Sequence, residues 1–160
     1  MVQLLRYVFL FACLMLSACD NGEPVSLGEQ NVMPEKELPV WLDGTVNMTP
    51  QEWLIMRSRP GNQETTAVPI NEQNAVGLLI DQASARFDES HRMVANRAAQ
   101  LQDMLAEHDI HEDAISLMQW FVDLPATQHP HSFSAMCQYY YNMRSQGYSQ
   151  QEVGQALLKM

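Results

Sequence analysis

The sequence predicts an all-α fold, a small bundle of four to five helices including one long helix, behind a flexible N-terminal tether. Between about residues 71 and 107, apolar residues recur at steps of three and four, so they line one face of a helix. The segments TPQE at 49–52 and SQQE at 149–152 are capping boxes, a sequence signature of a helix start. No segment shows the alternation of apolar and polar residues that is typical of a half-buried strand.

The first 18 residues have the layout of a secretory signal. Arg6 precedes an apolar run from Tyr7 to Leu16, and small residues follow this run. The run is too short for an ordinary membrane-spanning helix, which needs about 20 apolar residues. We therefore predict that residues 1–18 are an export signal that is absent from the mature protein.

The signal ends in the segment LSAC at 16–19, and here the sequence resembles bacterial lipoprotein precursors, whose lipobox has this pattern. The resemblance implies diacylglycerol transfer to the Cys19 thiol, cleavage between Ala18 and Cys19, and acylation of the new amine. Two or three acyl chains attach a protein stably to a bilayer, whereas one chain holds it only marginally. Ordinary signal cleavage and an uncleaved short anchor are the alternative interpretations.

Asp20 follows the cysteine of this motif. In enterobacterial lipoproteins, an aspartate at this position is associated with retention at the inner membrane. The resemblance therefore implies a periplasmic, lipid-anchored protein, with the inner membrane favoured over the outer membrane in a host that uses this sorting rule.

The charge of the chain makes nucleic acid an unfavourable partner. Nine Lys or Arg residues stand against nineteen Asp or Glu residues, for a formal net charge of −10. The only lysines are Lys36 and Lys159, and the arginines are scattered, so no basic stripe is available to follow a phosphate backbone. An acidic surface also repels anionic lipid headgroups, so we expect contact with the membrane through the lipid anchor.

Residues 19–48 are predicted to be a lipidated tether or linker, because prolines and glycines recur too often for a regular element. Within this segment, residues 39–42 (PVWL) form one apolar island. The first interpretation is that the island packs back on the helical domain. The second is that it is a peptide that docks on a partner, with Trp41 as a contact residue.

The helical domain is predicted over residues 49–160. A short helix runs from the Thr49 cap to about Ser58, and Pro60, Gly61 and Pro69 then break the chain. The long helix follows over about residues 71–107. Its apolar stripe is weak around Ser90, so a kink or break fits the sequence there.

Three more helices complete the prediction. One ends at Pro125, and acidic residues around Asp113 suit its N-terminus. Its predicted inner face comprises Ile115, Met118, Phe121 and Val122. The next runs from Phe133 to about Gln146, and Gly147 suits its C-terminal end. The last begins at the capping box at 149–152, and its apolar members are Val153, Leu157 and Leu158.

The chain contains weak candidates for a metal site and no recognisable catalytic motif. His108, His111 and Glu112 lie near a helix boundary, and zinc accepts both imidazole and carboxylate ligands. However, HExxH and paired-cysteine motifs are absent, as are GxSxG and phosphate-binding glycine loops. We therefore predict a protein that is not an enzyme and that has no cofactor and no metal. Cys137, within an apolar stretch, is interpreted as an inert core thiol, with a mixed disulfide to a partner as the alternative.

Three successive tyrosines at 139–141 give the nearest indication of a binding function. Neighbouring residues of a helix point about 100° apart, so the three rings cannot all face inward. We expect Tyr139 and Tyr141 to be possible partner contacts, because aromatic rings with a polar group suit protein interfaces.

These observations together predict a lipoprotein that is a structural or accessory component of an envelope protein assembly. In general layout the chain is similar to accessory lipoproteins of conjugation and type IV secretion systems, a resemblance that carries no domain motif. Two other interpretations remain open. One is a periplasmic metal-binding protein or enzyme that uses the histidine and acidic cluster, and the other is an exclusion or inhibitor lipoprotein.

Overall fold

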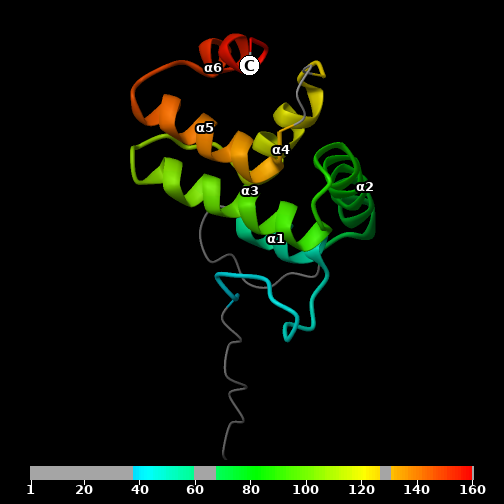
Figure 1. The fold of residues 1–160 in the computed structure, drawn as a ribbon. Helices are drawn as coiled ribbons and strands as arrows, with labels where there is room; N and C mark the ends of the chain where they lie inside the picture. The colour runs from blue at the N-terminus through cyan, green and yellow to red at the C-terminus, as the bar shows by residue number, and fades with distance from the viewer. Residues whose placement is uncertain (1–37, 60–67, 127–130, 160) are drawn as a thin grey trace, which may run out of the picture. The chain divides into compact units, whose positions relative to one another are not determined.

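The computed structural model describes residues 38–59, 68–126 and 131–159. All of these residues belong to one compact unit, Lys36–Met160. Within them the chain forms six helices and no strand (Figure 1). The helices are α1 (Pro50–Ser58), α2 (Ile70–Phe87), α3 (His91–Ala106), α4 (Ala114–Asp123), α5 (Phe133–Ser145) and α6 (Gln150–Leu157). The predicted all-α class is confirmed.

The predicted long helix is two helices, so the residues that the structure describes form six helices where four or five were predicted. Helix α2 ends at Phe87, and its C-cap Asp88 has a left-handed backbone (φ 52°, ψ 43°). Helix α3 then begins with Ser90 as its N-cap, and the Ser90 side chain accepts a hydrogen bond from the Met93 N–H at 3.3 Å. A left-handed residue cannot continue an α-helix, so the weak middle of the stripe is a true break.

The turn between α2 and α3 also supports another helix. The Glu89 carboxylate accepts hydrogen bonds from the Ser134 backbone N–H at 3.0 Å and from the Ser134 hydroxyl at 3.3 Å. Ser134 lies in the first turn of α5, where free backbone N–H groups favour a negative charge. The break therefore places a carboxylate at the start of α5, which a continuous helix would not do.

The helix starts and the turn predicted from local motifs are confirmed. Thr49 and Ser149 each close a complete capping box, on Glu52 and Glu152 respectively. Gly147 follows α5 with φ +91°, a conformation that glycine adopts without strain. These features depend on a few neighbouring residues, so local sequence is sufficient to predict them.

The capping boxes give an expected pH dependence. Hydrogen bonds from the Thr49 hydroxyl and backbone N–H lower the pKa of Glu52 from its ordinary value of 4.5. Those from Ser149 likewise lower the pKa of Glu152. Because each folded pKa lies below its unfolded value, the stabilisation is complete above the ordinary pKa and is lost as the pH falls through the lowered one.

We therefore consider the double variant Glu52→Gln/Glu152→Gln. When the pH is lowered from about 7 to about 3, its melting temperature should fall by less than that of the wild type. Glutamine keeps the capping geometry but does not titrate, and the difference should be roughly 2 °C. Thermal unfolding followed by circular dichroism measures this difference. Parallel pH curves for the two proteins would contradict the role of these carboxylates.

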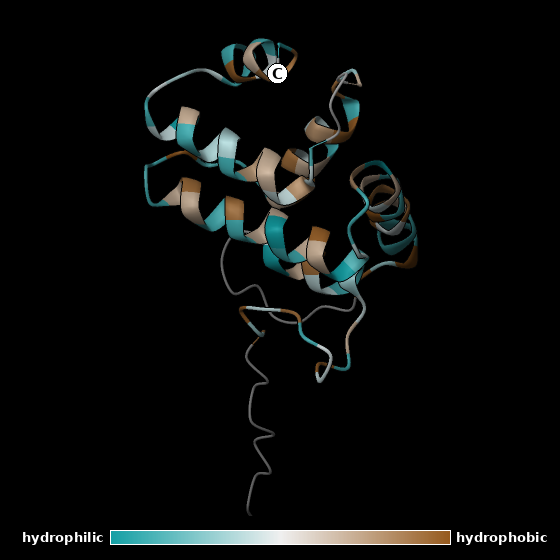
Figure 2. Cartoon of the chain, in the orientation of Figure 1, coloured by the Kyte–Doolittle hydropathy of each residue, from teal (hydrophilic) through white to brown (hydrophobic). Residues whose placement is uncertain are grey.

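The core lies around α3, which packs against α1, α2, α4 and α5. Figure 1 shows α3 and α5 side by side, with α6 beyond α5. Figure 2 shows brown and teal segments mixed along the helices, as expected when one face of each helix enters the core. The largest completely buried side chains are Trp53, Phe121, Phe133 and Tyr140.

Two predicted apolar faces differ from the structure. In α4 the buried residues are Ala114, Leu117, Met118 and Phe121, whereas Ile115 and Val122 are only half-buried. The face is rotated because this helix packs against α1, α2 and α3 together. In the last helix Leu158 is exposed, because α6 ends at Leu157 and Leu158 is its C-cap.

Residues 38–48, predicted as the end of the tether, form part of the compact unit. Leu42 is 1% exposed and belongs to the hydrophobic core. The first interpretation of the apolar island, packing on the domain, is therefore confirmed for Leu42. In the described ranges, none of the helices combines the length and the apolar character that crossing a bilayer requires.

Candidate functional site

The predicted site residues fall into three groups. Cys19 and Asp20 lie outside the described residues. Trp41 is 42% exposed, so its ring is available at the surface. Tyr139 and Tyr141 are half-buried and pack against the edge of the core on either side of the completely buried Tyr140. Each of the two outer tyrosines therefore presents only part of its ring to solvent.

The strap, which we define as residues 38–42, is held on the helices through its backbone. The Leu42 N–H donates to Asn96 Oδ1 at 2.8 Å, and Asn96 Nδ2 donates to the Leu42 carbonyl at 2.9 Å. The Trp53 indole N–H donates to the Pro39 carbonyl at 2.8 Å. Asn96 is 1% exposed and is the only buried polar residue in the part of the chain that the structure describes. Leu42 of the strap supplies hydrogen-bond partners for both the oxygen and the nitrogen of the Asn96 carboxamide.

Between its two attachment points the strap presents apolar side chains outward. Val40 is 76% exposed, and the Trp41 ring lies beneath the guanidinium of Arg97, with Cζ 5.6 Å from the ring centroid. A guanidinium over an indole face is an attractive cation–π pair. Arg97 also donates to the Gln100 side chain at 2.7 Å. Trp41 is thereby joined to the outer face of α3.

A pocket of about 240 Å³ lies between α3 and α5, next to this pair. Arg97, Gln100, Ser134 and Gln138 bring polar groups to the pocket, and Leu101, Met104 and Cys137 bring apolar surface. Apolar surface with a few hydrogen-bonding groups is typical of a site that binds a side chain or a short peptide segment.

The opposite end of this surface carries Tyr141. Its hydroxyl lies 3.0 Å from His108 Nε2, and the two ring centroids are 5.6 Å apart. Tyr141 follows the pocket residue Cys137 by four residues on α5, one helical turn farther along, and His108 lies just after the end of α3. We call the surface from Trp41 through the pocket to Tyr141 the α3–α5 seam. Tyr139 is not among the residues that line the pocket.

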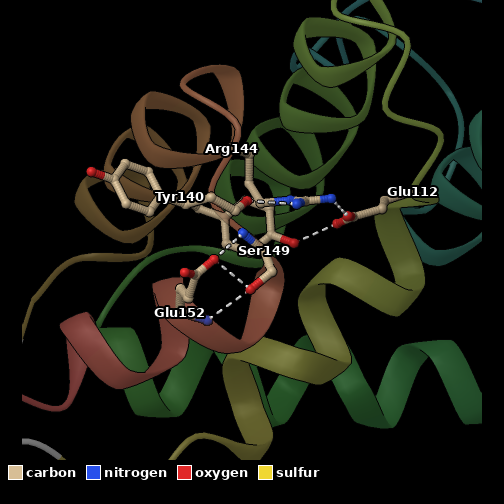
Figure 3. Close-up of polar contacts among 6 residues, drawn as sticks. Glu112, Tyr140, Arg144, Ser149 and Glu152 are labelled. Carbon is tan, nitrogen blue, oxygen red and sulfur yellow. Dashed lines mark hydrogen bonds and ion pairs between the residues drawn. The ribbon is translucent and has the colours of Figure 1, made fainter.

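Glu112, a weak metal-ligand candidate, is engaged in an internal network. One carboxylate oxygen accepts a hydrogen bond from the Tyr140 hydroxyl at 2.5 Å, and the other accepts one from Arg144 at 2.5 Å. Arg144 also donates to the Tyr148 carbonyl at 2.7 Å. Figure 3 shows Glu112 reaching Arg144, close to the Ser149–Glu152 capping box. The network connects the α3–α4 loop to the end of α5.

The structure does not bring the three metal-ligand candidates together. His108 contacts Tyr141, His111 is exposed, and Glu112 is bonded to Arg144 and Tyr140. In residues 38–59, 68–126 and 131–159, no three His, Cys, Asp or Glu side chains are grouped as metal ligands. The described chain therefore gives no support to the interpretation based on the histidine and acidic cluster.

Two nucleophilic groups are held in their protonated forms. Burial raises the pKa of the Cys137 thiol, and the nearby Glu89 carboxylate raises it further. Burial also raises the pKa of the Tyr140 hydroxyl, and its hydrogen bond to Glu112 acts in the same direction. Because the thiolate is the reactive form of cysteine, Cys137 is a poor nucleophile at neutral pH, in agreement with its interpretation as a core thiol.

Asn96 and Arg97 were not anticipated from the sequence. Asn96 lies among buried alanines and Val94 on α3, and a polar residue inside an apolar stripe is the one sequence signal that points to it. Arg97 gives no signal in the sequence, because its role depends on the strap, which meets α3 only in the folded chain.

Comparison with known protein families gives a match over the helical domain. A family model described as MoxZ matches residues 51–159, which is most of the chain. The match covers the helical domain from the first turn of α1 onward, whereas the strap and the predicted signal lie before it. No curated protein and no solved structure matches the chain significantly.

Proposed function

The chain belongs to the MoxZ family, whose model covers the helical domain alone, and for the whole chain we propose a lipid-anchored periplasmic protein that docks on an envelope protein assembly. In this proposal the helical domain is a binding module and not an enzyme. The lipid places the module at the membrane, with the inner membrane favoured by Asp20.

The anchor is supported by the order of three features at the N-terminus. A single cation, a short apolar run and the LSAC segment at 16–19 follow each other as in lipoprotein precursors. The segment from Cys19 to the start of the strap would span at most about 65 Å if it were fully extended. A domain on such a tether can reach partners near the bilayer surface.

The observation that carries the docking role is the α3–α5 seam. Trp41 and Tyr141, which were proposed separately as contact residues, lie at opposite ends of it. Between them lies a pocket with both apolar and hydrogen-bonding groups. Partly exposed aromatic residues and arginine are enriched at protein interfaces, which is the class of site that this surface resembles.

Site-specific photocrosslinking tests this role. A photoreactive residue in place of Trp41 or Tyr141 is expected to capture the same envelope protein in intact cells. A photoreactive residue in place of Leu78 serves as the control, because Leu78 is 59% exposed on α2 and does not line the seam. Cells that carry a conjugation or type IV secretion apparatus are the first sample that we would use.

Capture that depends on position would support the proposal. Capture from all three positions alike would indicate nonspecific collision, and no capture from Trp41 and Tyr141 would contradict docking through the seam. Mass spectrometry of the crosslinked bands identifies the partner and reports which of its residues meets each end of the seam.

A further inference from the structure

The contacts of the strap are those of a bound peptide. Three hydrogen bonds hold its backbone, at the Pro39 carbonyl and at both polar groups of Leu42. Leu42 is the completely buried side chain of the strap, and Leu38 is half-buried against the core, whereas Val40 and Trp41 face outward. When backbone bonds supply affinity and one buried side chain supplies specificity, the recognised feature is an extended segment with a leucine at one position.

The groups that hold the strap come from two other elements. Trp53 lies on α1 and Asn96 lies on α3, and both are inside the region that the MoxZ model covers. The strap lies before that region. We call the site formed by Trp53, Asn96 and the surroundings of Leu42 the slot. The slot therefore lies in the part of this chain that matches the family model, and its occupant is a segment that precedes that part.

The connection between the strap and α1 allows the strap to leave. Asp43, Gly44 and Thr45 are exposed, and their hydrogen bonds run within the turn, from the Thr45 N–H and hydroxyl to the Asp43 carboxylate. Release of Leu42 therefore requires no helix to unwind, since the Thr49 cap and its partner Glu52 lie farther along the chain.

We propose that the slot is a peptide-binding site that the chain fills with its own strap, and that an extended, leucine-containing segment of a protein partner takes the place of the strap. The inference deepens the proposed docking function and rests on it for the identity of the partner. The strap competes as an intramolecular ligand, whose effective concentration is on the order of millimolar for a short linker. Ligands that bind the slot weakly therefore do not displace the strap.

Peptide binding to the full chain tests the proposal. The probe is a fluorescent peptide with the sequence of residues 36–45 (KELPVWLDGT). Leu42→Ser in the protein removes the buried anchor of the strap and leaves the slot open. We expect the peptide to bind this variant at least tenfold more tightly than it binds the wild type, as measured by fluorescence anisotropy, because the competing strap is released.

Two further variants locate the binding. Asn96→Ala, added to Leu42→Ser, should weaken peptide binding at least tenfold because both backbone bonds to the leucine are lost. Trp53→Phe in the same background keeps an aromatic ring in the core but removes the indole donor, so it should also weaken binding if Asn96→Ala does not fold. In the peptide, Leu42→Ser should abolish binding, whereas Val40→Ala should leave it unchanged because Val40 faces solvent.

Equal binding of the peptide to the wild type and to Leu42→Ser would overturn the inference, as would binding that survives Asn96→Ala or Trp53→Phe in a folded protein. In either case the strap would be only a structural part of the domain. This assay uses neither the lipid anchor nor a partner protein, and the Tyr141 end of the seam takes no part in it. Its failure would therefore leave the photocrosslinking test of the proposed function intact.

Discussion

Phe121→Ala is expected to lower the free energy of unfolding by about 3–5 kcal/mol, the range for truncation of a buried phenylalanine. Phe121 is completely buried on α4. Its ring centroid lies 5.5 Å from those of Phe133 and Tyr140 and 5.2 Å from that of Trp120, in tilted, edge-on arrangements. Truncation would remove a ring that packs α4 against Phe133 and Tyr140 of α5 and would leave a cavity, since the large neighbours cannot all collapse into the space.

Urea unfolding followed by circular dichroism measures this loss. Leu78→Ala is the control, because Leu78 is exposed on α2, and it should change stability by less than about 0.5 kcal/mol. A loss below about 1 kcal/mol for Phe121→Ala would mean that the Phe121 ring is not packed in the core as the structure has it. In that case the packing of α4 described above would be wrong.

Cys19→Ala is expected to lose its lipid label completely and to accumulate as the uncleaved precursor. In lipoprotein precursors the thiol of the lipobox cysteine receives the diacylglycerol, and alanine has no group that can accept it. Metabolic labelling with a clickable fatty acid, together with gel mobility, measures both effects. Without acyl chains, which contribute about 0.8 kcal/mol per buried methylene, we expect no stable attachment beyond that of the signal itself.

Two variants control this experiment. Cys13→Ala removes the other cysteine of the predicted signal and should be labelled normally, because Cys13 does not belong to the LSAC segment. Asp20→Ser should also be labelled, but its distribution should move from the inner to the outer membrane if the host uses the aspartate rule. Normal processing of Cys19→Ala would remove the lipid anchor from the proposed function.

Local sequence predicts those parts of the fold that are held by hydrogen bonds between residues close together in the chain. The capping boxes at Thr49 and Ser149, and the turn at Gly147, each depend on residues within a few positions of one another. The break at Asp88 is different, because the helical pattern runs through it and part of its support is the bond between Glu89 and Ser134. That bond joins residues 45 positions apart, so a window of local sequence does not contain it.

The candidate site shows the same limit. Local sequence, namely the apolar island at 39–42 and the three successive tyrosines, was sufficient to single out Trp41, Tyr139 and Tyr141 as possible contacts. The position of Trp41 and Tyr141 on one seam depends on α3 and α5 lying side by side in the same direction, with Glu89 and Ser134 near one end and His108 and Tyr141 near the other. Helices that are neighbours in space but not in sequence leave no periodic signal, so the pocket between them could not be predicted.

The bonds of Asn96 also decide how the domain carries mechanical load. A pull on a lipid-held N-terminus would travel along the chain and reach the folded part first at the strap. There the tension would divide between Trp53 on α1 and Asn96 on α3, the helix at the centre of the bundle. The Thr49 end of α1 would be shielded from direct traction, so the bundle could follow a moving membrane without unwinding from its first helix.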